Sequence, residues 1–369
     1  MTGAQATYGG IASTNRNFLH ALIDVAQTRK IGLTVFSFLE KDSDRPAFAP
    51  NWLRFTGFEA NKIKLSIDLL SVARHRPLLC FDHVRLALPV LALAATGLVQ
   101  TVICAHGSES WRRLRRTSRW SFQSAALCLA NSQFTLDKMR QRMPQLNASA
   151  CPLGLSREFD LNHEVPERLQ KPIVLEAADR RCYALGDRAL LLVGRMHPNE
   201  REKGHYQLIK VLPQVLQRHP DVQLVLAGPG DDRANLQLLA QSQGVGAAVF
   251  LPGWLTNPDL ERLYRHCYAF VMPSRQEGFG LAYLEAMNYA KPCVGCSDQG
   301  AQDIIVDGET GYLVDDPDDS GKLVEVLHKL LSDPGQAHTL GRQGLARLHE
   351  HFTAHHYQQR VREQILRLL

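Results

Sequence analysis

Two glutamates bracket a glycine-rich helix start in the stretch RQEGFGLAYLE, residues 275–285. If residues 278–285 form a helix, a rise of about 1.5 Å per residue separates Glu277 from Glu285 by about 10–12 Å along its axis. A general acid and base acting on one bond need their carboxyls roughly 5–9 Å apart. We therefore expect the two carboxylates to contact opposite ends of one elongated ligand.

Two basic residues flank the loop GRMHPNEREKGH, residues 194–205. Arg195 follows a predicted strand directly and Lys203 precedes a predicted helix, so both cations can converge on one strand end. An arginine and a lysine together can neutralise a diphosphate without a metal ion. The alternative is a solvated charged loop, to which we assign Arg201 and Glu202.

Small residues, mostly glycine, end nearly every predicted strand in the second half of the sequence, as in LVLAGPG and VFLPGW. Glycine lets the backbone approach a ligand, and a helix N-terminus offers N–H groups to a phosphate. Ordinary turn glycines are the alternative. With the charged residues, the pattern fits a nucleotide sugar, with Glu277 at the sugar, Glu285 at the ribose and the base against residues 228–230 and 253–254. The predicted contacts include Gly228, Gly253, Trp254, Gly278, Phe279, Gly280 and Leu281.

Strand and helix patterns alternate along the chain, which predicts an α/β protein with doubly wound, mostly parallel sheets. The segment 152–188 lacks this pattern and is the predicted linker. We expect domains over 1–158 and 159–350, with a helix in 351–369 that returns to the first domain. The cleft between the strand ends of the two domains is the expected ligand site. Predicted strands cover 32–39, 77–83, 101–107, 125–132, 189–196, 222–230, 248–255, 268–274, 292–298 and 311–316; predicted helices cover 64–76, 133–143, 206–220, 233–244, 258–267, 280–290 and the region beyond 320.

The composition is that of a globular protein with a weak basic balance. The 369 residues are 45% hydrophobic and carry a formal net charge of +5, too little to argue for nucleic acid. The eight cysteines predict reduced core thiols in a cytosolic protein, although Cys293 and Cys296 form a CxxC pair that could serve metal or redox chemistry. No signal peptide is expected. The apolar run at 86–104 predicts a buried helix, a turn and a strand, with a membrane span as the alternative.

The motifs together resemble glycosyltransferase family 4, retaining enzymes of the GT-B fold. Glu277 and Glu285, in PSRQEGFGLAYLEAM, match the glutamate pair of that family, and Arg195 and Lys203 match its basic pair. YGGIAS at 8–13, with Gly9 and Gly10, resembles its N-terminal glycine loop, and His106 in AHGSESW matches a histidine of its cleft.

The resemblance implies two Rossmann-like domains that face each other across a cleft. It implies hexose transfer from a nucleoside diphosphate sugar to an acceptor hydroxyl with retention, without a cofactor or metal. Glu277, His106, Arg195 and Lys203 would act at the reaction centre, and Gly9 and Gly10 would join the donor contacts. GDP-mannose, or another nucleoside diphosphate hexose, is the donor that we expect, and the expected acceptor is a lipid-linked or polysaccharide precursor.

Two rival functions remain. The family begins with a full strand, whereas only MTGAQAT precedes the glycine loop here. A short or missing first strand would favour a catalytically silent nucleotide-sugar-binding partner of a membrane-bound transferase. A nucleotide-sugar epimerase of similar fold is the other alternative.

A basic stretch, WRRLRRTSRW at residues 111–120, places five arginines between Trp111 and Trp120. Such a segment suits an anionic membrane surface, with tryptophan at the interface. The alternative is an exposed helix whose tryptophans turn inward. We expect a cytoplasmic protein with a peripheral contact on the inner face of the plasma membrane, and no nucleic-acid partner.

Overall fold

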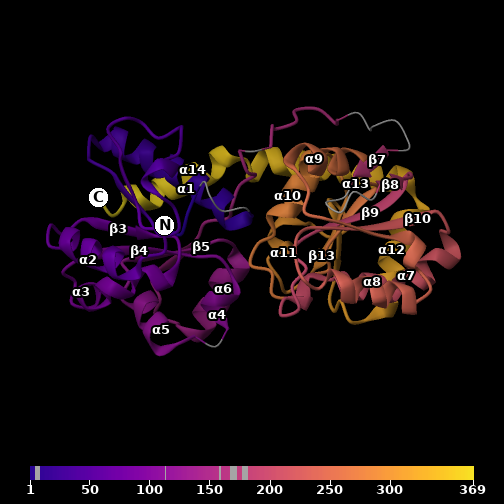
Figure 1. Ribbon diagram of the computed structural model, residues 1–369, viewed down its shortest axis with the longest axis horizontal. Helices are drawn as coiled ribbons and strands as arrows, with labels where there is room; N and C mark the ends of the chain where they lie inside the picture. Colours follow the sequence, from indigo (N-terminus) through magenta and orange to yellow (C-terminus); the bar gives the residue numbers. More distant parts are fainter. Residues whose placement is uncertain (5–8, 113, 158, 167–172, 177–181) are drawn as a thin grey trace. The chain divides into compact units, whose positions relative to one another are not determined.

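The computed structural model describes residues 1–4, 9–112, 114–157, 159–166, 173–176 and 182–369 (Figure 1). The chain forms two compact units. The first contains Met1–Phe159 and Phe352–Leu369, and the second contains Asp160–His351. The predicted α/β class with parallel sheets is confirmed.

The first unit contains a four-stranded parallel sheet in the order β3-β4-β5-β6 and a separate parallel pair, β1 and β2. The strands are β1 (Thr34–Ser37), β2 (Arg54–Gly57), β3 (Leu78–Phe81), β4 (Gln100–Ala105), β5 (Leu127–Ala130) and β6 (Ala148–Ala150). The helices are α1 (Gly10–Arg29), α2 (Lys62–Ala73), α3 (Leu91–Ala95), α4 (Ser108–Trp111), α5 (Arg116–Gln123), α6 (Gln133–Arg142) and α14 (Ala354–Leu366), with 3₁₀ turns η1 (Asp42–Asp44) and η2 (Val84–Val90).

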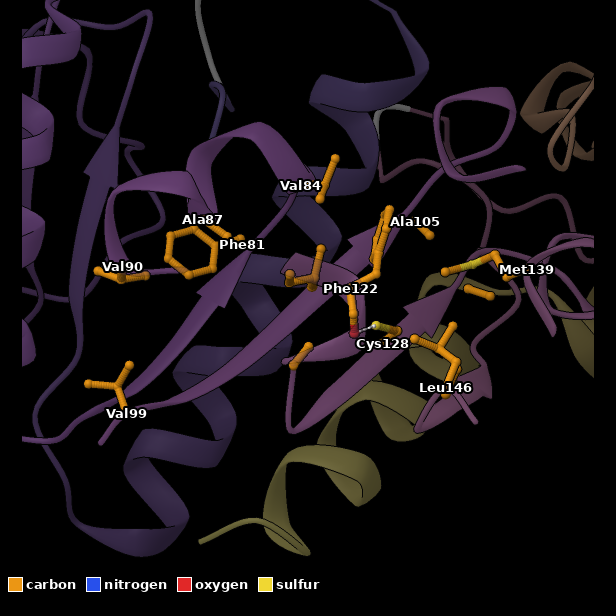
Figure 2. Close-up of a cluster of buried hydrophobic side chains, with 14 of the residues drawn as sticks. Phe81, Val84, Ala87, Val90, Val99, Ala105, Phe122, Cys128, Met139 and Leu146 are labelled. Carbon is orange, nitrogen blue, oxygen red and sulfur yellow. Dashed lines mark hydrogen bonds between the residues drawn. The ribbon is translucent and has the colours of Figure 1, made fainter. Parts of the chain in front are cut away.

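Buried apolar side chains hold the sheet of the first unit to its helices. Figure 2 shows Phe81 from β3, Phe122 from α5 and Met139 from α6 in one cluster. Residues 86–104 contribute most of η2, α3 and most of β4, which agrees with the predicted helix, turn and strand. Within the described ranges, every helix is too short or too polar to cross a membrane.

The helix α14 packs along α1 within the first unit (Figure 1). Val361 and Ile365 are buried, and Arg362 Nε lies 2.9 Å from Asp24 Oδ2. Just before α14, Phe352 O accepts a backbone hydrogen bond of 2.7 Å from Leu155 N of the same unit.

The second unit contains a six-stranded, fully parallel sheet in the order β11-β10-β9-β12-β13-β14. Its strands are β9 (Arg188–Val193), β10 (Val222–Ala227), β11 (Val249–Gly253), β12 (Ala269–Val271), β13 (Cys293–Cys296) and β14 (Gly311–Val314). Figure 1 shows α7 (His205–Arg218), α8 (Arg233–Ser242) and α12 (Ser320–Ser332) on one face, and α9 (Asn257–His266), α10 (Leu281–Asn288) and α13 (Pro334–His351) on the other. The short helices α11 (Ala301–Ile304), η3 (Arg201–Lys203) and η4 (Gly246–Ala248) complete the unit.

Two expectations need correction. The segment 152–188, predicted as a linker, contains the antiparallel strands β7 (Ile173–Glu176) and β8 (Cys182–Leu185). The CxxC pair lies on the buried strand β13, where burial raises the pKa of Cys296 to about 12. Cys293 and Cys296 are therefore protonated core thiols, as predicted. The second correction concerns Cys182, which is exposed and does not belong to the core.

Candidate functional site

The centre of the candidate site is an ion pair at the point where the strand order of the second unit reverses. Lys203 follows β9, Glu277 follows β12, and β9 and β12 are neighbours at this reversal. Lys203 Nζ donates a hydrogen bond to Glu277 Oε2, and the two side chains are 28% and 15% exposed. Open α/β sheets bind ligands at this switch point, outside the carboxyl ends of the strands.

Glycine backbones link the neighbouring strand ends to this pair. Gly194 N donates to Ala227 O at 2.9 Å, and Gly228 N donates to Gly253 O at 2.8 Å. A Cβ atom on Gly228, whose φ is +138°, would lie 2.2 Å from Gly194 O. The Lys203 stem passes Gly194, with Cδ 3.9 Å from where a Cβ would lie. The ends of β9, β10 and β11 therefore form one continuous backbone surface beside Lys203.

The loop before α10 is not helical, contrary to the expectation for residues 278–285. The helix begins at Leu281, and its N-cap Gly280 has φ +100°, so Gly278, Phe279 and Gly280 form a turn. The distance of 10–12 Å between the glutamates assumed a helix over this turn and does not apply. Phe279 is 1% exposed, so its ring belongs to the core of the unit and does not line an open ligand site.

Glu285 lies on the second turn of α10, where a tyrosine holds it. Tyr264 Oη donates to Glu285 Oε2 at 2.7 Å. Tyr264 is fully buried and stacks on Tyr289 with ring centroids 5.9 Å apart. Burial, followed by the Glu285 charge, raises the pKa of Tyr264 well above its usual range, so the phenol remains a donor. Sequence reasoning missed Tyr264 because nothing in its spacing relates it to Glu285.

Arg195 does not join the Lys203–Glu277 contact in this structure. Its side chain is 70% exposed, and Nη2 lies 3.1 Å from Glu200 Oε1 in the same loop. Its role at a diphosphate stays a prediction. Trp254, predicted beside the base, is 48% exposed.

The turn that carries Lys203 is fixed from two sides, so Arg201 and Glu202 are more than a solvated loop. Arg201 Nη2 lies 3.5 Å from Asp232 Oδ1 and stacks over the Tyr206 ring at 4.8 Å. Glu202 O accepts from Arg275 N at 2.7 Å, and Glu202 Oε1 accepts from Gln276 Nε2 at 3.2 Å.

His106 belongs to the first unit, where it follows β4. The carbonyl of Asp82 can only accept, so His106 Nε2 donates the 2.7 Å hydrogen bond to Asp82 O. This leaves Nδ1 as the ring nitrogen that faces away from the Asp82 contact. His106 N also donates to Glu109 Oε1 at 2.5 Å.

Asp82 links His106 to the start of the chain, and sequence reasoning missed it. Asp82 Oδ2 accepts from Thr2 N and from Asn15 Nδ2 of α1, each at 2.7 Å. Burial favours the neutral acid, but the N-terminal ammonium and the Thr2 hydrogen bonds outweigh it and lower the pKa of Asp82.

The described residues that precede α1 form no strand, although they hydrogen-bond to the segment at the end of β1. Gly10 begins α1, and Gly9 is its N-cap with φ +105°; residues 5–8 of the loop lie outside the described residues. Met1 and Thr2 run beside β1, because Phe38 N donates to Met1 O at 2.9 Å and Leu39 N donates to Thr2 O at 3.0 Å.

Of the two tryptophans of the basic stretch, one is buried and the other is exposed. Trp111 is 8% exposed and packs edge-on against Phe134 with centroids 5.2 Å apart, so it cannot be an interfacial anchor. Trp120 is 53% exposed. The residue at position 113 lies outside the described residues.

Two parallel α/β units and a charged site at a switch point are features of the GT-B class, and solved structures share that fold. A sucrose-phosphate synthase from Thermosynechococcus elongatus superposes with a TM-score of 0.74 at 19% identity, covering 100% of this chain and 96% of its own. Anabaena Alr3699/HepE, in complex with UDP and glucose, superposes with a TM-score of 0.71 at 18% identity, covering 98% of both chains.

Sequence comparison identifies the family. Residues 183–347 match the family described as Glycosyl transferases group 1. The uncharacterized glycosyltransferase YqgM of Bacillus subtilis is 32% identical over 273 residues, 72% of this chain and 68% of that relative. This chain belongs to the group 1 glycosyltransferases.

A further relative carries a more specific name over a shorter match. It is a GDP-mannose-dependent alpha-(1-6)-phosphatidylinositol monomannoside mannosyltransferase from Mycolicibacterium smegmatis, 31% identical over 191 residues, 50% of this chain and 48% of the relative. The chain spans about half the length, or less, of the first curated relatives that it matches.

Proposed function

We propose that this protein transfers a hexose from a nucleoside diphosphate sugar to an acceptor hydroxyl, with retention at the anomeric carbon and without a metal ion. The Lys203–Glu277 pair at the switch point carries the proposal, because it places a cation and a carboxylate where this fold binds ligands. The similarity to a GDP-mannose-dependent enzyme supports mannose as the hexose and GDP as the carrier.

The proposed mechanism uses the charges of the second unit. The bond from the anomeric carbon to the diphosphate breaks, the acceptor oxygen bonds to that carbon on the same face, and the departing phosphate oxygen takes the acceptor's proton. Lys203 has three N–H donors, so it can keep Glu277 while it binds a phosphate oxygen. With Arg195 and the α10 N-terminus it stabilises the charge on the leaving group. Glu277 orients the sugar, and Glu285 binds the ribose.

The test is the release of nucleoside diphosphate from GDP- and UDP-sugars, with a chelator present and with lipid-linked or soluble acceptors supplied. We expect chelator-resistant release from one donor, reduced at least about 100-fold in Lys203→Ala, which removes charge stabilisation of the leaving group, and in Glu277→Gln, which removes the carboxylate that orients the sugar. Lys322→Ala is the matched control, because Lys322 is an exposed lysine that pairs with Glu325 on α12. Binding without turnover would favour the silent partner, and an altered nucleotide sugar would favour an epimerase.

We also propose a peripheral contact between the first unit and an anionic membrane. Trp120 on α5 is exposed, as are Ile63, Ile67 and Leu70, which recur along one side of α2. Both helices pack against η2. The exposed Arg116 adds positive charge beside Trp120.

Sedimentation with phosphatidylserine vesicles tests this contact. Arg116→Gln should weaken binding about fivefold, since a cation near an anionic surface contributes about 1 kcal/mol. Trp120→Ala should weaken it as well. Trp52→Ala is the control, since Trp52 is also exposed in the first unit. Equal binding to phosphatidylcholine vesicles would contradict the proposal.

A further inference from the structure

A pocket of about 250 Å³ lies in the first unit, lined by residues of η2, α4 and the segment that leads into α5. The polar residues of its lining are His83, Arg85, Ser108, Glu109, Arg112, Arg115 and Ser118. The volume is below the roughly 300–1,000 Å³ of pockets for drug-sized ligands. The pocket therefore suits a small head group better than a whole oligosaccharide.

The charges of this pocket are unbalanced. Arg85, Arg112 and Arg115 bring three guanidinium groups, and no carboxylate among the described residues forms an ion pair with any of them. Glu109 is the one acidic residue of the lining, and its Oε1 accepts from His106 N and from Gly107 N at 3.1 Å. Guanidinium groups bind phosphate oxygens in bidentate geometry, so the lining fits a phosphate.

The neutral polar groups of the lining add donors. His83 Nδ1 accepts from Arg85 N at 3.2 Å, which leaves the proton of the neutral ring on Nε2. Burial lowers the pKa of His83, so this ring is neutral at physiological pH. The Ser108 hydroxyl is a further donor within the lining.

The pocket adjoins His106 through Glu109, which lines the pocket and accepts from the His106 backbone N–H. We propose that this pocket binds the phosphate or diphosphate group of the acceptor, held by Arg85, Arg112 and Arg115. The inference rests on the proposed transferase function, for which it names an acceptor class.

Binding of inorganic diphosphate tests the pocket by calorimetry. The protein carries Arg195→Ala and Lys203→Ala throughout, so that diphosphate cannot use the donor-site cations of the second unit. We expect binding in this background, weakened at least about tenfold by adding Arg85→Gln and Arg112→Gln, because two charge-assisted contacts are lost. Arg54→Gln is the matched control, as an exposed arginine of the first unit outside the lining, and should change the Kd less than about twofold.

Two further ligands distinguish the source of the phosphate. One is a soluble hexose monophosphate, and the other is a polyprenyl diphosphate in phosphatidylcholine vesicles. Preference for either supports the pocket and names the acceptor as soluble or lipid-linked. If Arg85→Gln with Arg112→Gln binds all three probes as well as Arg54→Gln does, the inference is wrong. If the pocket fails this test while nucleotide release still depends on Lys203, the proposed function stands without the pocket. If the pocket binds the probes but no such release occurs, only the proposed function is overturned.

Discussion

Glu285 depends on a tyrosine that the chain supplies from another helix. Tyr264→Phe removes the hydroxyl that donates to Glu285 and keeps the buried ring. A hydrogen bond to a charged group contributes about 1.5–3 kcal/mol, so we expect the Kd for the donor to rise about 10- to 100-fold. Tyr268→Phe is the control, because its hydroxyl donates to Leu330 O at 3.0 Å in the same unit. An equal rise in both variants would show that Tyr264 has no particular role at Glu285.

The buried His205, at the start of α7, makes the free energy of unfolding depend on pH. Burial, with the positive charge of Lys203 as the next cause, lowers the pKa of His205 from 6.5 to about 4. The unfolded chain therefore binds more protons than the folded chain between pH 6.5 and 4. The stabilisation by the neutral ring is complete above pH 6.5 and is lost as the pH falls to about 4.

Urea unfolding at several pH values from 4 to 7.5 checks this effect. As the pH is lowered from 6.5 to 4, the free energy of unfolding should fall more steeply for the wild type than for His205→Gln. The difference between the two slopes should be up to about 1.4 kcal/mol per pH unit. His338→Gln, which removes an exposed histidine of the same unit, should keep the wild-type slope. Parallel slopes for the wild type and His205→Gln would contradict the assignment.

At the scale of elements, α11 holds the turn that carries Glu277. Gly300 N donates to Glu277 O at 2.9 Å, and a Cβ on Gly300 would lie 2.4 Å from the backbone of Gly278. Gly300→Ala must shift this turn, at a cost of about 1–3 kcal/mol, and we expect nucleotide release to fall with it. Gly186→Ala is the control, since its Cβ would meet nothing closer than 3.7 Å. Normal stability and turnover in Gly300→Ala would show that the turn adapts freely.

The elements predicted from the sequence are those with strong patterns. The six strands of the parallel sheet in the second unit are apolar because such a sheet is covered on both faces. The strands β2 and β8 were missed because each is four residues long and mostly half-buried or exposed, which gives no continuous apolar run.

The residues of the candidate site also fall into those that the sequence predicts and those that only the structure reveals. Lys203, Glu277 and Glu285 stand in local motifs with fixed spacing, so the sequence could propose them. Tyr264 and Asp82 act through contacts that only the folded chain creates, 21 residues from Glu285 and 80 residues from Thr2. Composition and periodicity carry no information on such pairs.

At the scale of the whole molecule, the chain crosses from one unit to the other twice, and α14 completes the first unit after the second has ended. The first unit therefore depends on a segment that lies more than 190 residues beyond its other part. Ile365 on α14 is 2% exposed within the first unit, and Leu345 on α13 is 5% exposed within the second. The two side chains are matched probes of the two units.

Calorimetry with hydrogen exchange should resolve these units. Ile365→Ala and Leu345→Ala should each cost about 2–5 kcal/mol, because each leaves a cavity in a buried apolar layer. We expect Ile365→Ala to speed exchange in β3, β4 and β5 while β9 and β10 keep their protection. Leu345→Ala should do the reverse. Equal loss of protection in both units for either variant would mean that they unfold as one cooperative body, so that α14 stabilises the second unit as much as the unit on which it packs.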